Sequence, residues 1–188
     1  VENILIKSGN IGSVRIVRKI GVEKHKSFLE TIGILDKISF DIDEVGKPLK
    51  IDWNEGCKIE TIAFGHGITT TILQLAKGYA IISNGGYEIT PTLIKDNSNK
   101  KIKRLKVLSN DVSKKMNIMM RKVVSEGTAK LVNVEGYQVG GKTGTAEQVS
   151  NSIYSKTKIN TLASIFPTDN PKFVLVVMLE STKNNKDY

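Results

Sequence analysis

The feature that most constrains the fold is an uninterrupted apolar run near the C-terminal end of the chain. From Phe173 to Leu179 the sequence reads Phe-Val-Leu-Val-Val-Met-Leu, with an apolar side chain at every position. Successive side chains of a strand point to opposite faces, so this run predicts a strand that is covered on both faces. A chain of 188 residues can bury such a core within one domain. We therefore expect a sheet sandwiched by helices.

Two further segments have the residue pattern that is typical of strands. They run from Gln138 to Ala146 and from Thr161 to Phe166, and the segment 167–171, Pro-Thr-Asp-Asn-Pro, connects the second one to the apolar run. A Pro- and Asn-rich connection of this length between two strands is typical of a hairpin. Short segments around Leu93 and Val107 are additional strand candidates. The sequence thus predicts an antiparallel sheet in an α+β fold.

Apolar side chains at helical spacing predict four helices. They run from Asn10 to Ile20, from Val22 to Ile32, from a cap at Thr71 to the turn that begins at Ser83, and from Val112 to Val123. Thr71 and Gln74 match a capping box, which marks a helix start. Between Ser39 and Cys57 no period persists, as expected of a long connection.

Composition excludes several classes of protein. The chain is 39% hydrophobic and 25% charged, which is typical of folded soluble domains rather than disordered or membrane-embedded chains. No apolar run approaches the roughly 18–20 residues of a bilayer span, so any anchor or export signal is expected outside these residues. Cys57 is the single cysteine, and with only His25 and His66 beside it no metal-ligand spacing occurs. We expect no metal and no cofactor.

The net charge of +9 raises the question of a nucleic-acid partner. Positive charge is densest in the segment Lys95 to Lys106, where five of the twelve residues are Lys and one is Arg. This stretch has no interleaved aromatic side chains and includes Asp96 and three Asn or Ser residues, so it favours a solvated loop beside a basic strand over a nucleic-acid site. Attraction to an anionic surface or polymer stays open.

The strongest chemical signal is the string Lys142-Thr143-Gly144-Thr145-Ala146 on the first predicted strand. A Lys-[Ser/Thr]-Gly triplet alone occurs about 0.3 times by chance at this composition, and the added Thr and Ala lower that to well below about 0.01. The string places a cation beside a hydroxyl, which together can bind a carboxylate. Gly144 has no side chain to block a substrate along the strand edge.

This string resembles the Lys-Thr-Gly motif of penicillin-binding proteins and serine β-lactamases. A second motif of that family, Ser-x-Asn, has a counterpart in Ser8-Gly9-Asn10, which lies 134 residues upstream of Lys142 at a predicted helix start. A Ser-x-Asn string occurs about once by chance in such a chain, so its spacing and its position identify it. Five companion stretches resemble the monofunctional, cell-division or elongation type of transpeptidase; they lie at 64–68, 73–76, 84–86, 126–129 and 136–141. The resemblance extends from Lys7 to about Leu179.

The third motif of the family, Ser-x-x-Lys, supplies the nucleophile and precedes Ser-x-Asn in the family. Two such strings occur here, Ser98 to Lys101 and Ser155 to Lys158, but about two are expected by chance and both lie in polar stretches after Ser8. We assign neither a catalytic role. We expect the nucleophile upstream of Val1, so that residues 1–188 form the C-terminal portion of one transpeptidase domain that is incomplete at its N-terminus.

The resemblance implies a peptidoglycan D,D-transpeptidase that cross-links stem peptides ending in D-Ala-D-Ala by serine acyl transfer and that binds β-lactam antibiotics. It implies that Ser8 relays a proton to the leaving amine and that Asn10 binds the substrate amide. Lys142 would supply positive potential. Thr143, Gly144 and Thr145 would bind the substrate, with the Thr145 backbone N–H in the oxyanion hole.

Other readings of the same motifs stay open. A β-lactamase or a β-lactam sensor shares them, and a catalytically silent scaffold module is a further alternative. His66 titrates near neutrality but lies in a Gly-flanked connection, so we expect it to be structural, and we expect Cys57 to be inert. The family also implies a position at the periplasmic face of the bacterial inner membrane, together with membrane proteins of cell division or elongation as partners.

Overall fold

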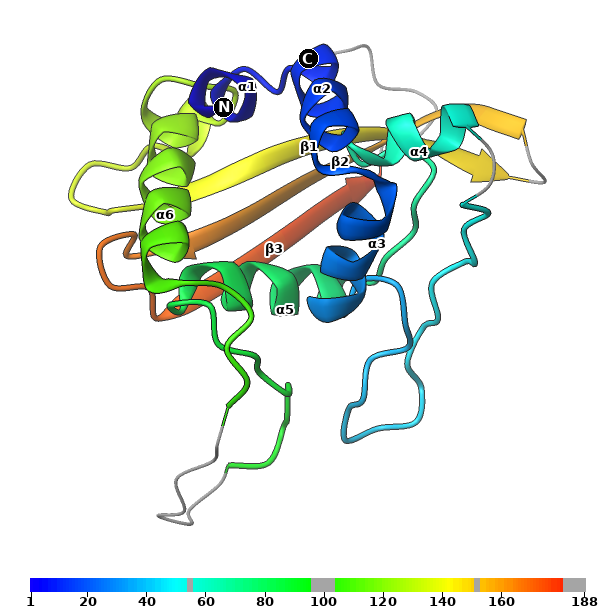
Figure 1. Cartoon of the computed structure of the whole chain (residues 1–188). Coiled ribbons are helices and arrows are strands. Elements are labelled where there is room, and N and C mark those ends of the chain that lie inside the picture. Colours follow the sequence, from blue (N-terminus) through cyan, green and yellow to red (C-terminus); the bar gives the residue numbers. More distant parts are fainter. Residues whose placement is uncertain (54–55, 96–103, 151–152, 181–188) are drawn as a thin grey trace.

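The computed structural model describes residues 1–53, 56–95, 104–150 and 153–180. The helices are α1 (Glu2–Ile6), α2 (Asn10–Ile20), α3 (Val22–Thr31), α4 (Gly56–Ile62), α5 (Ile72–Ser83) and α6 (Asn110–Ser125), and a 3-10 turn, η1, spans Lys130–Val132. The strands are β1 (Gly140–Ser150), β2 (Ile153–Phe166) and β3 (Phe173–Glu180). Helices pack against a central sheet, which confirms the predicted α+β class (Figure 1).

The three described strands form one antiparallel sheet in the order β1-β2-β3. Lys142 on β1 is opposite Ala163 on β2, and Phe166 is opposite Phe173 across the predicted hairpin. In the described part of the chain β1 therefore lies at the sheet edge. The string that begins at Lys142 is open on one side to a ligand.

The first two strands are longer than the sequence predicts. Beyond Ala146 on β1 and before Thr161 on β2, the chain continues as a paired hairpin, with an irregularity in register between Glu147 and Val149. These extensions are rich in polar residues. Backbone hydrogen bonds to the neighbouring strand stabilise these extensions, and such bonds require no alternation of apolar side chains. The hydrophobic pattern of the sequence therefore did not predict the extensions.

All four predicted helices are present. At the start of α5 the Thr71 hydroxyl accepts from Gln74 N at 3.1 Å, and Thr71 N donates to Gln74 Oε1 at 2.9 Å, which is the expected capping box. Two short helices were not predicted. These are α1, and α4, which begins within the connection predicted to extend to Cys57; both are too short for an apolar period to appear.

The strand predictions at Leu93 and Val107 were wrong. Leu93 lies in a bend with 70% of its surface exposed, and near Val107 the chain forms one isolated bridge between Tyr87 and Lys106. Neither segment pairs with a described strand over a ladder. Isolated strands are unstable without such pairing.

Coverage of β3 also differs from expectation within the described residues. α5 packs against β2 and β3, and α6 packs against β1. On β3 the half-buried Val174 and Val176 alternate with exposed side chains; Phe173, Leu175 and Val177 are 58%, 49% and 39% exposed. Helices of the described chain thus cover one face of this strand, and the apolar side chains of its other face contact solvent.

A small apolar cluster holds the N-terminal segment against the sheet. Ile6 of α1 packs with Val123 and Val124 of α6 and with Ala129, each at most 4% exposed. Burial of one such aliphatic side chain contributes about 1.5–3 kcal/mol. An exposed ion pair between Glu2 and Lys122 joins the same two helices. The residues that follow α1 are thereby fixed beside β1.

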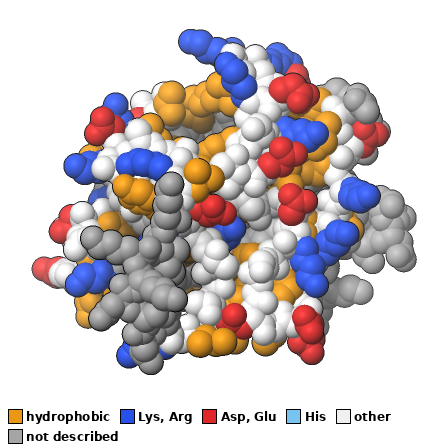
Figure 2. All heavy atoms as spheres, turned by 60° about the horizontal axis from the view of Figure 1, so that its bottom comes forward, with side chains coloured by type: hydrophobic (Ala, Val, Ile, Leu, Met, Phe, Trp, Pro, Cys, Tyr) orange, Lys and Arg blue, Asp and Glu red, His pale blue; other side chains and the backbone are white. Residues whose placement is uncertain are grey.

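Charged side chains of both signs are dispersed over one face of the molecule (Figure 2). On the face seen in Figure 2, the Lys and Arg side chains alternate with Asp and Glu side chains and with apolar patches. The part of Lys95–Lys106 between residues 96 and 103 lies outside the described residues. In the described ranges no helix is long and apolar enough to cross a bilayer, and no group of three His, Cys, Asp or Glu side chains could hold a metal ion.

Candidate active site

The turn between α1 and α2 places Ser8 in an uncommon backbone conformation. Gly9 N donates to Ile4 O at 2.9 Å and Ser8 N donates to Leu5 O at 3.3 Å, which is the Schellman pattern that ends many helices. Its left-handed position normally takes glycine, but here it is Ser8, with φ of 53°. A left-handed non-glycine residue costs roughly 1–2 kcal/mol. This strained position makes the Ser8 hydroxyl a candidate functional group.

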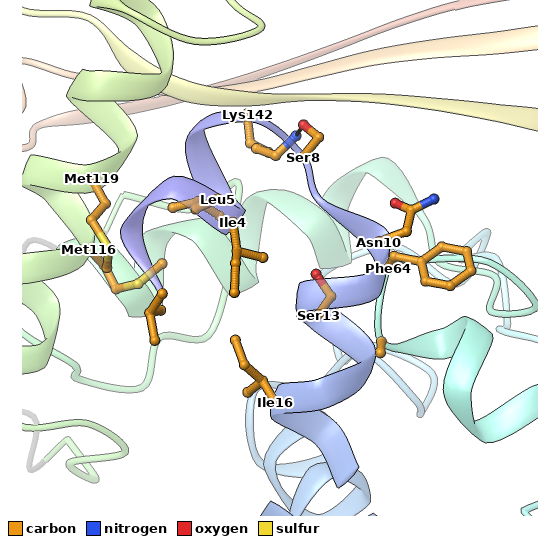
Figure 3. Close-up of a pocket in the computed structure, with 12 residues that line it drawn as sticks. Ile4, Leu5, Ser8, Asn10, Ser13, Ile16, Phe64, Met116, Met119 and Lys142 are labelled. Carbon is orange, nitrogen blue, oxygen red and sulfur yellow. Dashed lines mark hydrogen bonds between the residues drawn. The ribbon is translucent and has the colours of Figure 1, made fainter. Parts of the chain in front are cut away.

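The Ser8 hydroxyl accepts a hydrogen bond from the Lys142 ammonium across 134 residues of sequence. The same ammonium donates to the Thr143 carbonyl oxygen at 2.7 Å. An ammonium has three N–H donors, so a third remains for a ligand. The two motifs that the sequence singles out therefore meet, and Figure 3 shows Lys142 and Ser8 pointing toward one another below β1.

The Lys142 side chain is half-buried where it meets Ser8. Burial lowers its pKa from the ordinary lysine value of 10.5, because the charged form loses part of its hydration. Neither of these two contacts pairs the ammonium with a carboxylate, and a partly desolvated cation attracts an anion more strongly than one in water. The site is thus suited to an anionic ligand.

The Thr-Gly-Thr part of the string lies along the sheet edge. Thr143 is half-buried, whereas Gly144 and Thr145 are exposed. A Cβ added at Gly144 would meet no described atom within 4 Å, which leaves room for a ligand beside the strand. The Thr145 hydroxyl donates to Asn160 Oδ1 at 3.0 Å, so a ligand that takes its proton must replace that bond.

Asn10 is exposed at the first position of α2 and lines the same cavity as Ser8 and Lys142. The cavity has a volume of about 340 Å³. Its lining is mixed: besides polar side chains it includes apolar side chains of α1, α2, α6 and the segment after α4, namely Ile4, Leu5, Ile16, Phe64, Met116 and Met119 (Figure 3). Two methionines of α6, Met116 and Met119, therefore line this hollow.

A third threonine enters the site without having been predicted from the sequence. Thr128, in the turn after α6, has its Oγ1 2.8 Å from Thr143 Oγ1 and 3.5 Å from Ser8 Oγ. The resemblance covered residues 126–129 but gave none of them a role. The sequence signal that could have indicated Thr128 is the preceding residue, Gly127, because a glycine often marks a close approach of two backbones.

Replacing Gly127 by Ala should destabilise the protein by about 2 kcal/mol, because overpacking of this size typically costs 1–3 kcal/mol. A Cβ at Gly127 would lie 2.6 Å from Ile6 O and 2.7 Å from Val123 O, which are backbone atoms that cannot rotate away. Thermal or urea unfolding would measure the change. Gly144→Ala is the matched control, expected to change stability by less than about 0.5 kcal/mol; equal stabilities for the two variants would contradict the packing argument.

The remaining candidates lie away from this cluster or outside the described residues. The His66 ring stacks on Phe64 at 6.4 Å between centroids, and His66 is not among the side chains that line the cavity. Ser98 falls outside the described residues, and the side chains of Cys57 and Ser155 are not described. Ser155 itself belongs to β2.

Comparison with known proteins decides the family. The family model "Penicillin binding protein transpeptidase domain" matches residues 1–188, the whole chain. The chain belongs to this family. The predicted resemblance is confirmed, and the Ser8 and Lys142 motifs meet within a penicillin-binding protein fold.

Two relatives of this transpeptidase-family chain are 27% and 31% identical to it over the residues that align. Stage V sporulation protein D of Bacillus subtilis is 31% identical over 193 residues, and penicillin-binding protein PbpB of Mycolicibacterium smegmatis is 27% identical over 201 residues. Each match covers 96% of this chain but only 30% and 31%, respectively, of the relative. The chain thus spans less than a third of the length of these relatives.

Solved structures agree. The apo transpeptidase domain of Burkholderia pseudomallei penicillin-binding protein 3 superposes with a TM-score of 0.89 at 26% identity, over 95% of this chain and 55% of that one. Mycobacterium tuberculosis penicillin-binding protein 3 in complex with aztreonam gives 0.87 at 25% identity, over 96% and 45%. The second of these proteins binds a β-lactam.

Proposed function

We propose that this chain forms part of the active site of a peptidoglycan D,D-transpeptidase that also binds β-lactams. One observation carries the proposal: the Lys142 ammonium of the Lys-Thr-Gly strand bonds the Ser8 hydroxyl of the Ser-x-Asn turn within a domain of the penicillin-binding family. The names of several relatives, among them the probable peptidoglycan D,D-transpeptidase PenA of Neisseria flavescens, support the reaction class.

The reaction is acyl transfer between two stem peptides. A serine oxygen attacks the carbonyl carbon of the penultimate D-Ala, the C–N bond to the terminal D-Ala breaks, and that D-Ala leaves after its nitrogen accepts a proton. The amine of a neighbouring stem then attacks the ester, forms the new amide bond, and releases the serine. A β-lactam enters the first step and leaves the acyl-enzyme in place.

The proton for the leaving nitrogen passes through Ser8 in this proposal. Its hydroxyl accepts from Lys142 and keeps its own proton free to donate. Asn10, on the rim of the same cavity, hydrogen-bonds the substrate amide. The ammonium lowers the free energy of negative charge that develops nearby, which is the kind of preorganised contact that contributes most to catalysis.

The substrate carboxylate binds along the start of β1. Thr143 and Thr145 each offer a hydroxyl, Thr145 after exchanging its bond to Asn160. The exposed Gly144 between them leaves the space that the substrate backbone needs. The Thr145 backbone N–H forms one half of the oxyanion hole.

The nucleophile comes from outside these 188 residues in this proposal, which makes them the C-terminal portion of one transpeptidase domain. Ser8 and Ser13 are the serines that line the cavity, and isoleucine, not lysine, stands three residues after each of them. We place the intact protein at the periplasmic face of the bacterial inner membrane, with cell-division or elongation membrane proteins as partners. A relative in Caulobacter vibrioides is named probable peptidoglycan D,D-transpeptidase FtsI, which supports the peptidoglycan part of this proposal.

The intact protein should release D-Ala from a stem peptide that ends in D-Ala-D-Ala and should join it to an acceptor stem. Penicillin should abolish both activities. Mass spectrometry of the products measures the cross-link, and a D-amino-acid oxidase assay measures free D-Ala. Rapid hydrolysis of penicillin with many turnovers, in place of a lasting acyl-enzyme, would show a β-lactamase instead.

A further inference from the structure

Three hydroxyls and one ammonium form a continuous chain at the site. The Lys142 ammonium donates to Ser8, Ser8 Oγ lies 3.5 Å from Thr128 Oγ1, and Thr128 Oγ1 lies 2.8 Å from Thr143 Oγ1. The four side chains come from three different parts of the fold: the α1–α2 turn, the turn after α6, and β1. Thr128 occupies the middle of the chain and has no role in the reaction described above.

Proton counting gives the chain a direction. An ammonium only donates, so Ser8 accepts from Lys142 and keeps its own proton for the leaving nitrogen of the substrate. A bound carboxylate only accepts, so Thr143 donates its single proton to the carboxylate and accepts from Thr128 Oγ1, 2.8 Å away.

The turn that carries Thr128 is fixed by packing on both sides of this residue. Gly127 lies against the backbones of Ile6 and Val123, so that no side chain would fit there. Ala129 is 2% exposed in the apolar cluster, and its N–H donates to Val123 O at 3.1 Å. An exposed hydroxyl held by two fixed neighbours keeps its direction without reorganisation when a ligand arrives.

We propose that Thr128 is a positioning residue that orients the Thr143 hydroxyl as a hydrogen-bond donor to the carboxylate of the bound substrate or β-lactam. This role rests on the proposed function. Without the Thr128 hydroxyl, no neighbouring donor fixes the direction of the Thr143 proton, which can then turn toward water. The acylation rate should then decrease for ligands that carry the carboxylate and stay nearly unchanged for ligands that lack it.

The test compares a penicillin with its methyl ester on the intact protein. Thr128→Val keeps the shape of the side chain but removes its hydroxyl. We expect this variant to be acylated by the penicillin about tenfold more slowly than wild type, as for one lost hydrogen bond to a charged group. Acylation by the ester should change less than twofold, and Thr128→Ser should restore the penicillin rate.

Control variants distinguish a loss of Thr143 orientation from a general destabilisation of the protein. Thr31→Val replaces an exposed threonine whose hydroxyl donates to Ser27 O in its own helix, and it should leave both rates unchanged. Thr128→Ala serves as a second variant if the valine lowers the unfolding temperature. Equal penicillin rates for wild type and Thr128→Val, or equal slowing of penicillin and ester, would overturn the positioning role while leaving the transpeptidase proposal intact. A wild-type protein that penicillin does not acylate would overturn both.

Discussion

The 188-residue chain by itself should form no covalent adduct with a fluorescent penicillin, whereas the intact protein should be acylated stoichiometrically. Covalent capture needs a serine activated by a neighbouring base and placed at the oxyanion hole. In the cavity, Ser8 accepts from an ammonium, which makes its oxygen less nucleophilic, and Ser13 donates to Gly9 O at 3.1 Å within its helix. Neither has a lysine three residues later.

Intact-mass spectrometry after incubation with penicillin measures this difference. Circular dichroism should first show that the short chain is folded, so that an absent adduct reflects an absent nucleophile. An adduct on the short chain that maps to Ser8, Ser98 or Ser155 would show that the nucleophile has been assigned to the wrong part of the protein. Acylation of the intact protein alone would support an active site divided between this chain and another segment.

Replacing Lys142 by Ala in the intact protein should slow β-lactam acylation by roughly a hundredfold, the loss expected when one preorganised electrostatic contact of about 3 kcal/mol is removed. The ammonium donates to Ser8 and to the Thr143 carbonyl, which leaves its third N–H for a ligand. Folding should change little, because a half-buried cation without a carboxylate in these contacts contributes little to stability.

Stopped-flow acylation kinetics measure the rate, and Lys114→Ala, an exposed lysine near the start of α6, is the matched control. Burial lowers the pKa of Lys142 below the ordinary lysine value of 10.5. The wild-type acylation rate should therefore fall as the pH rises and the ammonium loses its proton, with the midpoint of the fall below pH 10.5. That decline should be missing from Lys142→Ala. A folded variant with the wild-type rate would remove Lys142 from the mechanism.

Local patterns predicted most of the elements that surround the site. The Thr71 capping box, the helix that starts at Asn10 and the hairpin before Phe173 each depend on residues close in sequence, and each is present. The same holds for the string at Lys142, because side-chain chemistry and strand position are both readable within five residues. Its resemblance to a transpeptidase motif gave the family, which the match over the whole chain confirms.

Contacts between residues far apart in the sequence determined two features of the sheet that local patterns did not predict. Exposure of one face of β3 depends on which helices pack against it, and the extended β1–β2 hairpin depends on backbone pairing between polar strands. Neither property leaves an apolar period in the sequence.

The sequence by itself determined the strand that carries Lys142, the turn that carries Ser8 and the family to which both belong, because these are local patterns of residue type and spacing. Only the tertiary structure decided that the two side chains meet, and that Thr128 joins them from the end of α6. The physical reason is that a hydrogen bond between residues 120 or 134 positions apart is set by the packing of helices on the sheet. That packing follows from many small apolar contacts, such as those of Ile6 with Val123 and Val124, and from the space at Gly127 where two backbones approach.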